Sequence, residues 1–179
     1  MLALLTAPKE FMWLHHPLDV LGAQNLDFAW IYNSGMILFG VFLILISTLI
    51  HHKYEFPQAM TYAMVGFGMS AILMAIWKSE NIFYLSQLNL EEHHSHEQFS
   101  HLAILSITIC IGIHALLAKD QYLRKVHFIA CFLVISSYSS FLLFDDYQGL
   151  SQLVLWMVIL LWIPLFYGRL NQHANIHQL

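Results

Sequence analysis

Five long apolar runs, separated by short polar stretches, dominate this chain of 179 residues. The runs lie at residues 28–50, 58–77, 99–118, 126–144 and 150–167. A membrane-crossing α-helix needs about 20 consecutive apolar residues. Backbone groups in lipid must also be satisfied within their own segment, which favours helices. The pattern therefore predicts an all-α, polytopic bundle of five transmembrane helices, forming a single integral membrane domain over residues 1–179.

The stretches outside the runs are shorter and more mixed. Residues 1–27 include Phe11 and Trp13, which suit a membrane interface. Pro17 and Gly22 interrupt any continuous helix there. We therefore expect a short interfacial N-terminal segment or a re-entrant cap. Residues 168–179 are predicted to form a polar tail.

Composition supports a membrane location. Apolar residues make up 59% of the chain and charged residues only 10%, whereas a soluble domain carries about 25% charged residues. The net charge of −4 and the absence of a basic stripe argue against a nucleic-acid partner. Cys110 and Cys131 both lie within apolar runs, so no disulfide framework is indicated.

Lysine and arginine predict the orientation, because cytoplasmic ends of membrane helices are enriched in them. The ends on the side of the N-terminus carry two such residues, Lys9 and Lys78. The opposite ends carry five: Lys53, Lys119, Arg124, Lys125 and Arg169. We expect the N-terminus outside and the tail in the cytoplasm, in a bacterial inner membrane.

This topology gathers imidazoles and carboxylates on the outer face. They are His15, His16, Asp19, Asp27, the residues of 91–97, His101, Asp145 and Asp146. His94, Glu97 and His101 are spaced to share one face of a helix, and His93 with Glu97 and His101 would do nearly as well. With Asp145 they form the first candidate metal site, for zinc or another divalent ion. The alternative is a solvated polar rim.

A second candidate site lies within the membrane. Cys110 and His114 on the third run mirror His127 and Cys131 on the fourth, across a short connection. Antiparallel neighbours would place both histidines at one depth and both cysteines one turn deeper. Two thiols and two imidazoles could form a tetrahedral zinc site. The alternative is that both pairs only pack between helices.

Residues 18–40 resemble a bacterial membrane family, domain of unknown function 998, in their Leu-Gly turn, asparagine and glycine-containing helix. Leu21, Gly22, Asn33 and Gly40 fill those places. His101 and the stretch 149–162 are also similar to the family. The family usually has a spanning helix before the Leu-Gly turn, whereas 17 residues precede Leu18 here. The resemblance implies a membrane helix bundle and no particular activity.

Three functions are compatible with these features. The simplest is an accessory or structural membrane subunit, which would have a partner membrane subunit or a second copy of itself. The first alternative is a zinc-type membrane enzyme that acts on lipid at the outer leaflet. The second alternative is a transporter or small-ligand-binding membrane protein. All three have the lipid bilayer as a partner.

Overall fold

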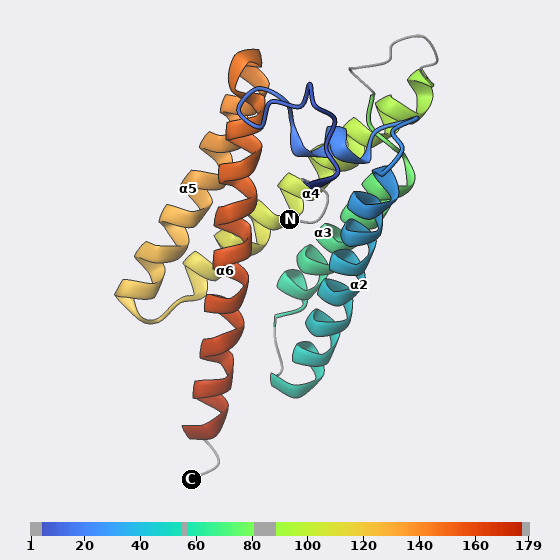
Figure 1. The fold of residues 1–179 in the computed structure, drawn as a ribbon. Helices are drawn as coiled ribbons and strands as arrows, with labels where there is room; N and C mark the ends of the chain where they lie inside the picture. Colours follow the sequence, from blue (N-terminus) through green and yellow to red (C-terminus); the bar gives the residue numbers. More distant parts are fainter. Residues whose placement is uncertain (1–4, 55–56, 81–88, 177–179) are drawn as a thin grey trace.

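The computed structural model describes residues 5–54, 57–80 and 89–176, and it is helical (Figure 1). Its elements are η1 (Leu18–Gly22), α2 (Ala29–Tyr54), α3 (Gln58–Ile76), α4 (Leu90–Leu117), α5 (Gln121–Leu143), η3 (Asp145–Tyr147) and α6 (Gln148–Ile176). Within the described residues, five helices are long and apolar enough to cross a membrane. The predicted all-α class and the five spans are confirmed, and the orientation in the membrane stays a prediction.

Helix α4 begins well before its apolar run. The side chain of Asn89 accepts a hydrogen bond from the backbone N–H of Glu92 at 3.2 Å and caps the helix. Glu91 and Glu92 in the first turn also complement the positive end of the helix dipole. The histidine-rich stretch is therefore helical, and it carries its side chains in fixed directions above the apolar part.

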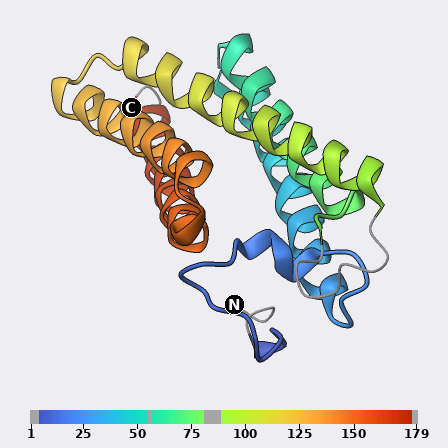
Figure 2. The ribbon, with the colours of Figure 1, turned by 90° about the horizontal axis from the view of Figure 1, so that it is seen from above.

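Consecutive helices pack side by side, and α5 with α6 lies to one side of α2, α3 and α4 (Figure 2). The approach of α2 to α3 depends on two glycines that face each other. A Cβ built on Gly40 would lie 2.4 Å from the carbonyl oxygen of Gly68, and one built on Gly68 would lie 2.7 Å from that of Gly40. Small residues of this kind allow membrane helices to come into backbone contact.

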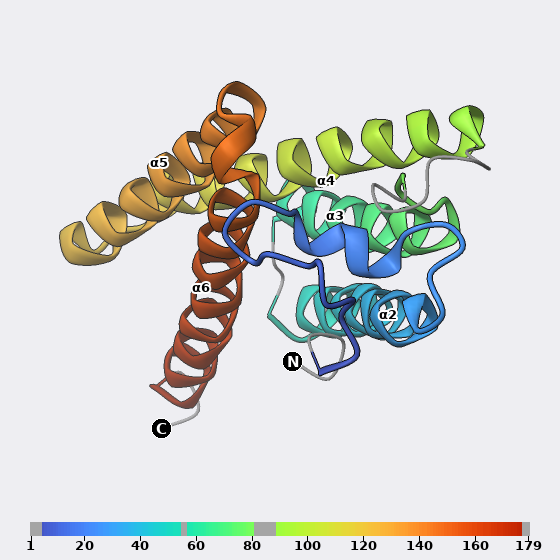
Figure 3. The ribbon, with the colours of Figure 1, turned by 45° about the horizontal axis from the view of Figure 1, so that its top comes forward.

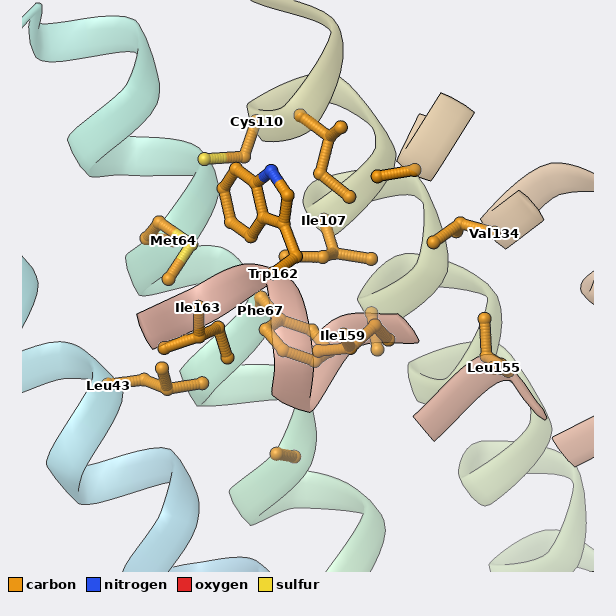
Figure 4. Close-up of a cluster of buried hydrophobic side chains, with 14 of the residues drawn as sticks. Leu43, Met64, Phe67, Ile107, Cys110, Val134, Leu155, Ile159, Trp162 and Ile163 are labelled. Carbon is orange, nitrogen blue, oxygen red and sulfur yellow. The ribbon is translucent and has the colours of Figure 1, made fainter. Parts of the chain in front are cut away.

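Helix α6 contributes large aromatic side chains to the core between the other helices. Figure 4 shows buried side chains of several helices converging around Trp162, which is fully buried. Trp156 makes ring contacts with Phe39 of α2 and Phe67 of α3. These contacts hold α6 against the α2–α3 pair, although it follows α5 in the chain.

Residues 11–24, here called the strap, run across the end of the bundle where α2, α4 and α6 begin (Figure 3). The backbone N–H of Leu150 donates to the carbonyl of Leu14 at 3.0 Å, which ties the strap to α6. Gln24 exchanges two hydrogen bonds with the backbone of Asn89, at 2.9 and 3.1 Å, which ties the strap to α4. The N-terminal segment thus lies against protein, as a cap on the bundle.

Candidate functional site

A pocket of about 540 Å³ lies beneath the strap, at the same end of the bundle. We call it the outer pocket, after the orientation that the lysine and arginine distribution predicts. Its walls come from the strap, the segment after α3, the first turns of α4, the end of α5, η3 and the start of α6. Five of its lining residues are histidines: His15, His16, His93, His96 and His101. Five are acidic: Asp19, Glu80, Glu97, Asp145 and Asp146.

The most buried polar pair in this pocket joins the strap to α4. His96 Nε2 lies 3.3 Å from Asp19 Oδ2, and the two side chains are only 6% and 13% exposed. The other ring nitrogen, Nδ1, donates to the carbonyls of Met74 and Trp77 at 2.9 and 2.8 Å. Carbonyls only accept, so Nδ1 carries a proton, and an ionised Asp19 requires a proton on Nε2 as well. The geometry is that of an imidazolium–carboxylate pair.

His93 lies between two carboxylates on the α4 side of the pocket. Its Nε2 is 3.5 Å from Glu97 Oε1 and 3.7 Å from Glu80 Oε2. Its Nδ1 is buried and has no hydrogen-bond partner in the described part of the chain. A buried polar atom without a partner is costly.

The opposite wall of the pocket is aromatic and belongs to α5. Tyr138 and Phe141 both line the pocket, and their rings are stacked with centroids 6.2 Å apart and planes 8° apart. The Tyr138 hydroxyl hydrogen bonds to His101 Nδ1 across the space between α5 and α4. This contact closes the pocket on its membrane side.

The strap itself contributes two neighbouring histidines. His15 Nδ1 donates to the carbonyl of Asp146 at 2.7 Å, which joins the strap to η3. His16 Nδ1 accepts a hydrogen bond from the backbone N–H of Met12 at 3.0 Å. Burial, and to a smaller extent the charge on His15, lowers the pKa of His16. The neutral form that can accept this hydrogen bond is therefore favoured.

The first predicted metal set is only partly brought together. Glu97, His101 and Asp145 line the outer pocket, whereas His94 does not. The His94 side chain is 71% exposed, and it contacts Gln98 at 3.1 Å and Glu97 at 3.8 Å on the outside of the helix. The alternative member, His93, does line the pocket. Among the described residues, no three His, Cys, Asp or Glu side chains are grouped to hold a metal ion, and metal binding stays a prediction.

The sequence interpretation missed His96 as the buried histidine of this cluster. A signal for it existed in the helical period of α4. His96 is seven residues before Ala103 and fourteen before Cys110, and all three are buried on the core face of the helix. A heptad count from the apolar part of α4 would have distinguished it from His94.

The second predicted set divides into two parts. His114 and His127 stack with ring centroids 4.9 Å apart and planes 8° apart, so the two histidines do meet at one depth. Trp162 Nε1 donates to His127 Nδ1 at 2.9 Å. The Cys110 thiol instead contacts the carbonyl of Met60 on α3 at 3.9 Å. Cys131 is half-buried, and a site combining all four side chains stays a prediction.

These features define a small five-helix membrane protein with a charged pocket under a strap at one end. The chain belongs to a family described as Protein of unknown function (DUF998), whose model matches residues 1–168. The resemblance seen in the sequence is confirmed by this match. No curated protein and no solved structure matches the chain.

Proposed function

We propose that this protein is a small-ligand-binding membrane protein that takes a cationic ligand in the outer pocket. The observation that carries the proposal is the charge of that pocket. Five carboxylates line about 540 Å³, and no lysine or arginine is among the described residues that line it. The volume lies within the range of about 300–1,000 Å³ typical of small-ligand sites.

The histidines offset only part of this charge. Asp19 is balanced by His96 at 3.3 Å, and that pair is almost fully buried. Glu80 and Glu97 both lie near the imidazole of His93, and Glu97 also lies 3.8 Å from His94 Nδ1. A hollow lined by one sign of charge and walled by low-dielectric protein concentrates ions of the opposite sign. A bound cation would relieve the repulsion between the remaining carboxylates.

The accessory-subunit hypothesis gives no role to these charges. A bundle that only packs against a partner requires apolar or small-residue faces, and it does not require carboxylates around a pocket. That hypothesis and the zinc-enzyme hypothesis stay predictions. The zinc enzyme would need three ligands around one ion, and the described side chains form no such group.

Calorimetric titration of the purified protein in a neutral detergent tests the proposal. The probe is tetramethylammonium, with acetate as the anionic comparison. We expect saturable binding of the cation and none of acetate. Glu97→Gln and Asp145→Asn should each weaken cation binding by about fivefold, as expected for the loss of about 1 kcal/mol of charge interaction at a partly hydrated site.

Glu91→Gln is the matched control, because Glu91 lies on the same helix and does not line the outer pocket. Its cation affinity should equal that of the wild type. Equal weakening in all three variants, or no cation binding at all, would overturn the proposal. Stoichiometric zinc in the purified protein, lost on His101→Ala, would support the metal-enzyme hypothesis in its place.

A further inference from the structure

We infer that the ligand of the outer pocket is an alkylammonium ion, whose charge faces the carboxylates and whose apolar substituent lies against α5. This inference rests on the function proposed above and narrows its ligand class. The pocket has two chemically different walls. The strap, the segment after α3, α4 and η3 supply its acidic residues. Tyr138, Phe141 and Leu142 of α5 supply an aromatic and aliphatic side.

The volume of the outer pocket argues against a bare inorganic ion as the ligand. One water occupies about 30 Å³ of liquid, so a metal ion would leave most of the 540 Å³ to solvent. An ammonium ion that carries several carbon atoms fills more of this space. It also needs no grouped metal ligands, in agreement with the absence of such a group among the described residues.

The stacked pair on α5 gives a chemical reason for an ammonium group. Tyr138 and Phe141 lie parallel, with planes 8° apart, and both line the pocket. Aromatic rings attract ammonium groups through their quadrupole, and this attraction strengthens when water is excluded. Carboxylates supply the long-range charge, and the rings select a cation with a weakly hydrated, carbon-bearing surface.

The apolar wall ends in exposed aliphatic side chains. Leu142 lines the outer pocket and is 54% exposed, and Leu143 beside it is 73% exposed at the end of the same helix. An alkyl substituent held against this wall would extend along the end of α5. Two sources share this chemistry: the ammonium of a phospholipid headgroup and a free alkylammonium ion.

The test compares three probes by calorimetry in nanodiscs of phosphatidylglycerol. They are tetramethylammonium, hexyltrimethylammonium and the uncharged analogue 3,3-dimethylbutanol. We expect hexyltrimethylammonium to bind at least about tenfold more tightly than tetramethylammonium, because each buried methylene contributes about fourfold. The uncharged analogue should not bind measurably. Phe141→Leu should weaken both cations by about fivefold.

Phe132→Leu is the matched control, since Phe132 lies on the same helix and is 69% exposed away from the pocket. It should bind both cations as the wild type does. Equal affinity for the two cations, or unchanged binding in Phe141→Leu, would overturn the alkylammonium inference while the cation-binding function stands. If none of the cations binds, both the alkylammonium inference and the proposed cation-binding function are wrong.

A second arm of the test distinguishes the two sources. The hexyltrimethylammonium titration is repeated in nanodiscs that contain phosphatidylcholine or phosphatidylethanolamine in addition to phosphatidylglycerol. Weaker apparent binding in these discs supports the inference and assigns the site to a lipid headgroup. Unchanged binding also supports it and assigns the site to a free alkylammonium ion.

Discussion

Replacing Asp19 by asparagine should release the strap from the end of the bundle. The carboxylate lies 3.3 Å from His96 Nε2, in a pair that is nearly inaccessible to water. At an effective dielectric constant of about 20, two unit charges at that distance attract by about 5 kcal/mol. The free-energy cost of desolvating the two charges offsets part of this attraction. Removing one partner of a buried pair nevertheless costs about 3–5 kcal/mol, because the other charge is left uncompensated.

Asparagine keeps the shape and one acceptor oxygen, so we take the lower value of about 3 kcal/mol. Hydrogen exchange in nanodiscs measures this locally. The informative amides are those of Ala23 and Gln24, which donate to the carbonyls of Val20 and Ser79 at 3.0 and 3.1 Å. Their protection should fall by about two orders of magnitude in Asp19→Asn. Amides in the middle of the helices should keep their protection, because the pair lies at one end of the bundle.

Asp27→Asn provides the control, since Asp27 is exposed just after the strap. It should leave the protection of the strap amides unchanged. A second check places Asp19→Asn in a His96→Gln background, where it should add little, because the charge it compensates is already gone. If the protection of the strap amides falls less than threefold in Asp19→Asn, the Asp19–His96 pair does not hold the strap on the bundle. An equal fall in Asp27→Asn would refute this role as well.

Four further results are expected. Gly40→Ala should destabilise the bundle by about 1–3 kcal/mol, because the added methyl group would lie 2.4 Å from the carbonyl oxygen of Gly68. The measurement is the temperature of aggregation in detergent, which should fall. Gly35→Ala is the control and should leave this temperature unchanged, because a Cβ at Gly35 meets open space. Trp162→Phe should cost about 1–3 kcal/mol in the same assay through the lost 2.9 Å hydrogen bond, with the exposed Trp30→Phe unchanged. The lowered pKa of His16 means that this imidazole takes up a proton less readily in the folded strap than in the unfolded chain, so the strap should lose stability as the pH falls below about 6.5. The measurement is hydrogen exchange of the Met12 amide, which donates to His16, corrected for the pH dependence of the intrinsic exchange rate. An unchanged protection of this amide between about pH 7.5 and 5.5 would contradict the prediction. Fused at the C-terminus, a fluorescent protein should fluoresce and alkaline phosphatase should be inactive if the lysine and arginine distribution predicts the orientation correctly.

The sequence by itself determined the five membrane spans and the polar character of one end. Long apolar runs can satisfy their backbone only as helices, so the class follows from composition and length alone. Asn89 and the acidic residues after it also place the histidine-rich stretch on a helix, although the apolar run starts later. The family likeness rested on residues such as Leu21, Gly22, Asn33 and Gly40, and the match over residues 1–168 agrees with it.

Only the tertiary structure decided which polar side chains meet. His94 and His96 are two positions apart, yet one is 71% exposed and the other is buried against Asp19. Successive residues of a helix turn by about 100°, so the helical period of α4 separates the two. The packing of α4 against α3 then decides that His96 meets the carbonyls of Met74 and Trp77. The strap then supplies Asp19 from far away in the chain, and α5 supplies Tyr138. Such contacts depend on packing between distant segments, and no local sequence pattern specifies them.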